Sequence, residues 1–123
     1  TFLFDPNPSI RRIITIGSCL GERVGAPNMT LYSMSKAAVI GLSKGLAQDL
    51  GARGITVNVV QPGPVDTDMN PADGEGADAQ RAGLPLGEYG RPEDVAATVA
   101  HLAGPGGNFI TGTAISVDGG FSA

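Results

Sequence analysis

Several residue types are scarce in this chain of 123 residues, and each scarcity excludes something. The only cysteine is Cys19, so no disulfide can form within the chain, and the composition suits a reducing compartment. There is no tryptophan and only 5% of the residues are aromatic, which predicts an aliphatic, alanine-rich core. No apolar run approaches the roughly 20 residues that cross a bilayer, and there is no signal-peptide pattern. We therefore expect a cytoplasmic protein with no membrane partner.

Basic charge is also scarce. Eight lysine and arginine residues are scattered among twelve acidic ones, for a net charge of -4. This balance argues against nucleic acid as a partner. Four aspartates in a Gly- and Ala-rich segment suggest a metal site, but their spacing fits a solvated loop better: Asp66, Asp68, Asp73 and Asp78. We expect no metal.

The chain does have 19 glycines and nine prolines, and they fall between apolar runs as turns do. Residues 11–17, 55–60 and 114–117 are short, β-branched and mostly apolar, which is typical of strands in a parallel sheet. Residues 1–10 contain two prolines and are predicted to be an irregular lead-in. The remainder, 11–123, is predicted to be one α/β domain with crossover helices between its strands.

Two helices and a long loop are predicted between these strands. Apolar residues at helical spacing make one stripe over residues 28–53: Val39, Leu42, Leu46 and Leu50. Small residues beside the stripe would let another backbone approach closely: Ala37, Ala38, Gly41 and Gly45. Pro92 followed by two acidic residues opens a second helix that runs to about residue 102. Residues 64–90 are predicted to be a mobile loop with a short helix near 77–83.

Tyr32 and Lys36 place a phenol and an ammonium one turn apart on the first helix. A free tyrosine ionises only near pH 10. A neighbouring cation favours the phenolate, so such a pair can exchange a proton with a carbonyl or an alcohol. The alternative interpretation is a solvated helix face.

Two further candidates lie where predicted strands end, which is where open α/β folds bind ligands. The hydroxyl of Ser18 can hydrogen-bond a substrate oxygen, or it can simply cap a loop. Pro62-Gly63 can let a flat ring approach the backbone, or it can be an ordinary turn. Cys19 has no evident basic partner and is interpreted as a packing residue rather than a nucleophile.

Four segments in order resemble the C-terminal half of a short-chain dehydrogenase/reductase, of the kind that includes 3-oxoacyl-carrier-protein reductases. They are ITIGS at 14–18, YSMSK at 32–36, NVVQPGPVDT at 58–67 and VDGG at 117–120. The resemblance covers roughly residues 11–123. It implies that the three strands are the C-terminal part of a Rossmann-like parallel sheet.

The resemblance also implies roles. The protein would be an oxidoreductase that transfers a hydride between NAD or NADP and a small carbonyl or alcohol substrate. Ser18 would polarise the carbonyl, Tyr32 would be the general acid or base, and Lys36 would favour the phenolate and bind the nicotinamide ribose. Four residues would border the nicotinamide: Pro62, Gly63, Val65 and Thr67. The loop at 64–90 would be the substrate lid, although it offers no diagnostic polar cluster.

The family's glycine-rich pyrophosphate turn is absent from the sequence, and so is the residue that selects NAD or NADP. The nucleotide-binding N-terminal half is therefore missing, and the chain is either a fragment or a short protein. The alternative function is a non-catalytic truncated relic that binds a ligand or partner, or self-associates.

An apolar edge at strand 11–17 and the small-residue helix at 29–52 would both need to be covered. The resemblance implies a subunit interface at that helix. We expect a homo-oligomer, a dimer or a tetramer, that uses one of these two surfaces.

Overall fold

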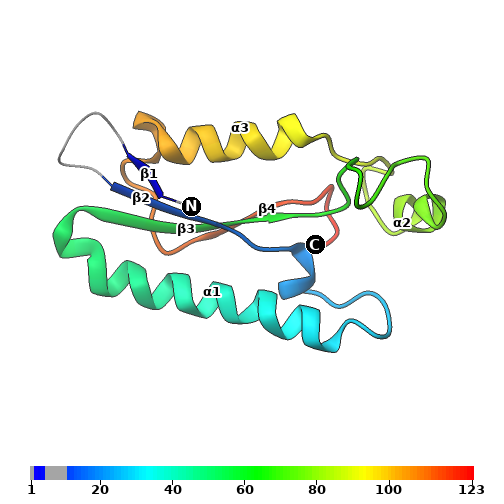
Figure 1. Ribbon diagram of the computed structural model, residues 1–123, viewed down its shortest axis with the longest axis horizontal. Coiled ribbons are helices and arrows are strands. Elements are labelled where there is room, and N and C mark those ends of the chain that lie inside the picture. Colours follow the sequence, from blue (N-terminus) through cyan, green and yellow to red (C-terminus); the bar gives the residue numbers. More distant parts are fainter. Residues whose placement is uncertain (1, 5–10) are drawn as a thin grey trace.

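A computed structural model describes residues 2–4 and 11–123, with side chains from residue 11 onward. Figure 1 shows three layers, with one helix on each face of a central sheet and a short helix beyond one end of it. The elements in chain order are β1 (Phe2–Phe4), β2 (Arg11–Ile16), η1 (Cys19–Gly21), α1 (Thr30–Leu50), η2 (Gly51–Arg53), β3 (Ile55–Pro62), α2 (Ala77–Ala82), α3 (Pro92–Ala103), η3 (Pro105–Gly107) and β4 (Ala114–Val117). No helix in this described part is both long and apolar enough to cross a membrane.

The predicted parallel sheet is confirmed. Strand β2 pairs with β3 in parallel, from Arg11 opposite Ile55 to Ile16 opposite Val60. Strand β3 pairs with β4 in parallel, beginning with Val59 opposite Ala114. Helix α1 connects β2 to β3, and α3 lies between β3 and β4 in the chain. Each connection therefore returns the chain to the same end of the sheet before the next strand.

The first residues differ from the irregular lead-in that we expected. Residues 2–4 form β1, which pairs antiparallel with β2 so that Phe2 lies opposite Ile13. Residues 1 and 5–10, including both prolines of the lead-in, lie outside the described residues. An edge strand presents unpaired N–H and C=O groups, and an extended segment satisfies them. Among the described residues, β1 therefore covers Arg11–Ile13 of the edge that we predicted to be open.

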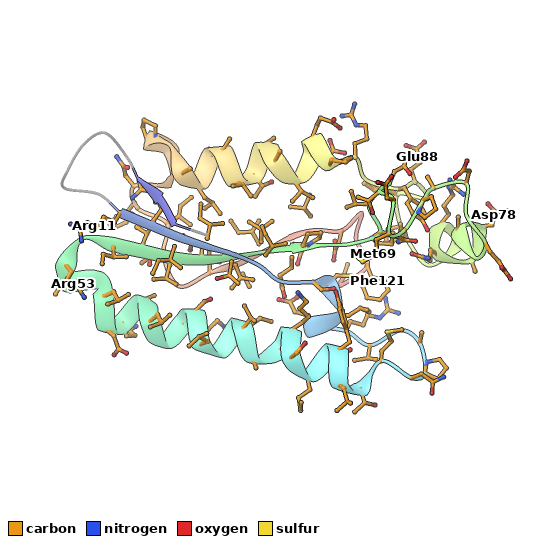
Figure 2. The ribbon with its side chains drawn as sticks, in the orientation of Figure 1. Arg11, Arg53, Met69, Asp78, Glu88 and Phe121 are labelled. Carbon is orange, nitrogen blue, oxygen red and sulfur yellow. The ribbon has the colours of Figure 1, made fainter. Side chains whose placement is uncertain are left out.

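The core lies in two layers, and both are aliphatic as the composition predicted. Toward α3 the sheet buries Ile14 and Val60 against Leu102. Toward α1 it buries Ile55 and Val57 against Ala47. Successive residues of a strand point to opposite faces, so odd-numbered positions of β3 face α1 and even-numbered ones face α3. Figure 2 shows side chains of both helices reaching toward the sheet between them.

The apolar stripe predicted on α1 is only partly correct. Val39, Leu46 and Leu50 are half-buried, but Leu42 is 61% exposed. The side chains that α1 buries most deeply are Ser33, Ser43 and Ala47. One residue turns a helix by about 100°, so Leu42 lies well to the side of its buried neighbour Ser43. Leu42 therefore adds an apolar side chain to the outer face of α1.

Arg12 is fully buried and joins the start of β2 to the end of α3. Its Nε donates to the carbonyl oxygen of Leu102 at 2.9 Å, and its Nη2 donates to the side chain of Asn108 at 2.5 Å. The last carbonyl groups of a helix have no partner within the helix. Arg12 supplies a donor to one of them and so fixes α3 against the sheet.

The segment at 64–90 closes on itself at a neck. Val65 and Gly90 form a bridge, with the N–H of Asp66 donating to the oxygen of Gly90 at 2.9 Å. Farther out, the amides of Asn70 and Gln80 exchange two hydrogen bonds of 3.0 and 3.2 Å. Helix α2 confirms the short helix predicted near 77–83. The segment is thus bonded largely to itself, and beyond the neck the N–H of Leu86 donates to the oxygen of Gly119 at 3.1 Å.

Candidate active site

The predicted site residues gather where β2 and β3 end. The N–H of Gly17 donates to the oxygen of Val60 at 2.8 Å, and that of Gly63 donates to Val117 at 3.0 Å. Ser18 and Pro62 therefore lie at the same edge of the sheet. In Figure 2 the labelled Phe121 lies at this end of the molecule, whereas Arg11 lies at the opposite end.

Ser18 lies two residues after the end of β2 and is buried, with 7% of its surface exposed. Its Oγ accepts a hydrogen bond from the N–H of Leu20 at 3.2 Å, which caps η1. The alternative that Ser18 caps a loop is therefore confirmed. A hydroxyl that accepts through its oxygen still has a proton to donate, so capping leaves Ser18 able to hydrogen-bond a substrate oxygen.

Gly21 sets the turn of Ser18 against α1. A Cβ at Gly21 would lie 2.9 Å from the carbonyl carbon of Lys36 and 3.0 Å from its oxygen. Only a residue without a side chain lets the turn rest directly on the helix there. The turn that begins at Ser18 is thereby packed on the same part of α1 that has Tyr32 and Lys36.

Tyr32 and Lys36 lie in the first two turns of α1, as their spacing predicted. Tyr32 is 47% exposed and Lys36 is half-buried. The Nζ of Lys36 lies 5.6 Å from the centroid of the Tyr32 ring. This is within the range of a cation–π contact, so the ammonium stays beside the phenol instead of extending into solvent.

The four residues expected to border a nicotinamide follow one another from the sheet edge into the lid. Pro62 ends β3, Val65 lies in the neck, and Thr67 is exposed in a turn closed with Asn70. A Cβ at Gly63 would lie 2.6 Å from the Cα of Asp118, so the contact between these two backbones already requires a glycine. The part of these residues in cofactor binding stays a prediction.

Sequence reasoning missed two contacts that hold the loop after Ser18. The Nε2 of Gln61 donates to Glu22 at 2.8 Å. Arg23 donates to the carbonyl oxygen of Phe121 at 2.7 Å and lies 5.1 Å from the centroid of its ring. The only local signal was Gln61 itself, a polar residue at the end of a buried apolar strand.

Cys19 is buried beside Ser18. Burial raises the pKa of its thiol, and the nearby carboxylate of Asp118 raises it further. The thiol is therefore held in its protonated, weakly nucleophilic form at neutral pH. This agrees with the interpretation of Cys19 as a packing residue.

A cavity of about 540 Å³ opens between the end of the lid, the start of α3 and the end of β4, with Leu86, Tyr89 and Asp118 among its lining residues. Ser18, Tyr32 and Lys36 do not line it. Within the described part of the chain, no group of three His, Cys, Asp or Glu residues is placed to hold a metal ion.

Comparison with known proteins identifies the family of the chain. A family model described as enoyl-(acyl carrier protein) reductase matches residues 6–122. The chain belongs to the short-chain dehydrogenase/reductase family. It is 48% identical over 116 residues to the cyclic-di-GMP-binding biofilm dispersal mediator protein of Escherichia coli K12, covering 94% of this chain and 49% of that protein. It is 47% identical to the 3-oxoacyl-[acyl-carrier-protein] reductase FabG of Haemophilus influenzae, covering 89% of this chain and 45% of the relative.

Two solved structures superpose closely on the chain. A blue fluorescent protein from a metagenomic library, in complex with NADPH, is 59% identical with a TM-score of 0.92 and covers 94% of this chain and 47% of that one. A short-chain dehydrogenase from Burkholderia cenocepacia, in complex with NADP, is 57% identical with a TM-score of 0.90 and covers 92% and 46%. The expectation of a partial Rossmann-like sheet is confirmed. The chain spans about half the length of the curated relatives it matches.

Proposed function

We propose that the chain carries the catalytic half of an NADP(H)-dependent oxidoreductase that interconverts a carbonyl and an alcohol. One observation carries the proposal: the glycine contact with Lys36 packs the turn of Ser18 on the part of α1 that has Tyr32 and Lys36. A hydroxyl, a phenol and an ammonium thus belong to one packed unit at the carboxyl end of the sheet. NADP(H) is favoured over NAD because two similar solved structures contain NADPH and NADP.

Each side chain has a distinct task. In the direction of reduction, Ser18 donates a hydrogen bond to the carbonyl oxygen, and Tyr32 gives its phenolic proton to that oxygen as the carbonyl carbon becomes saturated. The ammonium of Lys36 stabilises the negative charge that develops on the Tyr32 oxygen. In the direction of oxidation, the Tyr32 oxygen takes the proton back from the alcohol. Ser18 keeps its cap on η1 throughout, because it accepts from Leu20 and donates to the substrate.

The donors at the site suit the nicotinamide end of the cofactor, which when bound supplies or accepts the hydride. We expect the Lys36 ammonium and the Tyr32 phenol to hydrogen-bond ribose hydroxyls, and the hydroxyl of the exposed Thr67 to hydrogen-bond the carboxamide. Pro62 and Val65 offer apolar surface on the same segment. The chain spans about half the length of its relatives, so a test must ask whether it holds the dinucleotide alone.

The test has two steps. The purified chain is first titrated with NADPH, and a saturable change in nicotinamide fluorescence is expected. Turnover is then followed as loss of NADPH absorbance with ethyl acetoacetate, a small ester with the 3-oxoacyl group named for the H. influenzae relative. Because general acid catalysis contributes about 10²- to 10⁴-fold, Tyr32→Phe should lose that much turnover. It should still bind NADPH, with an affinity lowered only by the loss of one hydrogen bond.

Lysine variants supply a matched control on the same helix. Lys36→Met should lose most turnover, whereas Lys44→Met, an exposed position two turns along α1, should retain it. Full turnover by Tyr32→Phe would contradict the catalytic role. Failure to bind NADPH at millimolar concentration would exclude autonomous redox activity and favour the non-catalytic alternative, a relic that binds another ligand or partner.

A further inference from the structure

Gln61 is an unusual residue for its position. It lies one residue before Pro62, at the end of a strand whose preceding residues are buried, and it is itself fully buried. The alternation of β3 directs it to the same face as Val57 and Val59, which is the face toward α1. A Cβ at Gly17 would lie 3.6 Å from its Cγ, which places its side chain directly beneath the start of the Ser18 turn.

The amide of Gln61 is only half satisfied. Its Nε2 donates to the Oε1 of Glu22 at 2.8 Å. Its own Oε1 is buried and has no hydrogen-bond partner among the described residues. An unpaired buried carbonyl lowers stability, and leucine would fill a similar volume without that cost. The packing of the core therefore does not require an amide at this position.

Glu22 is the residue through which the amide acts. The N–H groups of Glu22 and Arg23 both donate to the oxygen of Cys19 at 3.1 Å, which closes η1 at its far end. Ser18 caps the same turn at its near end. A carboxylate that accepts from a buried amide makes a stronger hydrogen bond than a neutral acceptor does. The bond from Gln61 thus ties the whole turn to β3.

A second hydrogen bond, on the surface, holds the same loop. Arg23 donates to the carbonyl oxygen of Phe121, in a contact that is exposed to solvent. The loop is consequently held by one exposed contact at the C-terminal segment and one contact whose donor is buried in the sheet. The buried donor belongs to the strand that leads directly into Pro62-Gly63, so it is the tie that joins the two sides of the candidate site.

We propose that Gln61 is a positioning residue: through Glu22 it anchors the turn that begins with Ser18, so that this turn and the segment at Pro62-Gly63 are held as one unit. The inference rests on the proposed function for its catalytic consequence, but the anchoring itself is a property of the folded chain. The two parts can therefore be tested separately.

The anchoring is tested by amide hydrogen exchange, read by mass spectrometry on peptides that contain residues 19–23. Gln61→Leu and Glu22→Leu should each lower the protection of the Gly21, Glu22 and Arg23 amides by about tenfold, the equivalent of one hydrogen bond to a charged group. Glu22→Gln keeps an oxygen that can accept from Gln61, so it should retain most of the protection. Gln80→Leu removes another bonded amide, in the lid, and should leave these peptides unchanged.

Three exchange results would count against the proposal. One is unchanged protection of residues 21–23 in Gln61→Leu. Another is a Glu22→Gln variant that exchanges as fast as Glu22→Leu, because the turn would then depend on charge or bulk rather than on the bond to Gln61. Loss of protection throughout β3 and α3 would also count against it, since that pattern indicates general destabilisation.

The catalytic consequence is tested with NADPH and ethyl acetoacetate. Gln61→Leu and Glu22→Leu should each lower kcat by about tenfold with little change in the KM for NADPH. Glu22→Gln should keep most of the kcat that Glu22→Leu loses. An unchanged kcat in a variant whose turn is demonstrably loosened would refute the positioning role. If the unsubstituted chain has no turnover, the proposed function fails, and the exchange experiment still decides whether Gln61 anchors the turn.

Discussion

At the scale of single residues, Cys19 has a side chain that is reactive as a free thiolate, but its buried position suppresses that reactivity. Burial first, and the carboxylate of Asp118 second, raise the pKa of its thiol. Only the thiolate reacts readily with alkylating reagents. The native protein should therefore react slowly with iodoacetamide at neutral pH, and the reaction should accelerate at a higher pH than it does for the unfolded chain.

The same experiment in denaturant is the control, since the unfolded thiol titrates near its ordinary pKa of about 8.5. Asp118→Asn should lower the pKa of the native Cys19 thiol part of the way toward its unfolded value, because it removes the smaller of the two causes that raise it. Rapid alkylation of the native chain at neutral pH would contradict the protonated state of the buried thiol.

Hydrogen bonds between residues far apart in the chain could not be predicted from the sequence. Ser18, Tyr32 and Lys36 were found from local spacing and from their position after a strand, both of which are properties of neighbouring residues. The bond between Gln61 and Glu22 and that between Arg23 and Phe121 join distant parts of the chain. No local pattern marks such pairs, because they depend on how the sheet and its loops pack. Arg12 is a similar case, since its partners belong to the far end of α3.

At the scale of secondary-structure elements, the start of α3 is set by a charged pair. The carboxylate of Asp94 accepts from the backbone N–H of Arg91 at 2.8 Å and from its guanidinium at 3.0 Å. The hydrogen bond from the Arg91 side chain lowers the pKa of Asp94 first, and the bond from the Arg91 backbone adds to the effect. The pair is exposed, so salt screens it.

This pair predicts a pH dependence with a defined sign. A carboxyl whose pKa is lower in the folded chain stabilises the fold fully above its unfolded pKa, about 3.9, and the stabilisation is lost as the pH falls through the folded value. Amide chemical shifts in the first turn of α3 should therefore move toward unfolded values as the pH is lowered below about 4. Asp94→Asn should abolish this transition, whereas Glu93→Gln should keep it. A transition that survives in Asp94→Asn would assign it to another carboxyl.

The elements themselves were largely predictable, because local composition determines them. Short β-branched runs gave β2, β3 and β4, and Pro92 with the following acids gave the start of α3. Strand β1 was not predictable, because three residues next to prolines carry no periodic signal and their pairing depends on the free edge of β2. The outward position of Leu42 was missed because a four-residue spacing does not by itself define the centre of the buried face.

At the scale of the whole molecule, the outer face of α1 is the surface that most needs a partner. Three apolar side chains on it are 75%, 62% and 61% exposed: Leu31, Met34 and Leu42. Ala38 and Gly45 lie between and beyond them on the same face, so a second helix can approach closely. We propose that two copies of the chain pack along this face in a symmetric dimer, in which each copy presents the same surface.

Light scattering of the purified chain should accordingly give the mass of a dimer. The double variant Met34→Lys/Leu42→Lys should give the mass of a monomer, because it places two ammonium groups in the interface. Ala97→Lys adds the same charge at an exposed position of α3, on the other face of the sheet, and should leave the dimer intact. A monomeric unsubstituted chain at every concentration measured would rule out this assembly.

The neck at Val65 and Gly90 has a consequence for how such a protein diversifies. Because the two ends of segment 64–90 meet there, and residues 66–83 make their hydrogen bonds largely with one another, the outer part of this segment can change with little effect on the sheet. Under the proposed function, this segment would carry substrate preference while Ser18, Tyr32 and Lys36 carry the chemistry. We expect that a segment from a relative with another substrate, grafted between Thr67 and Gly90, would bring a new preference and keep the proposed catalytic and cofactor-binding residues.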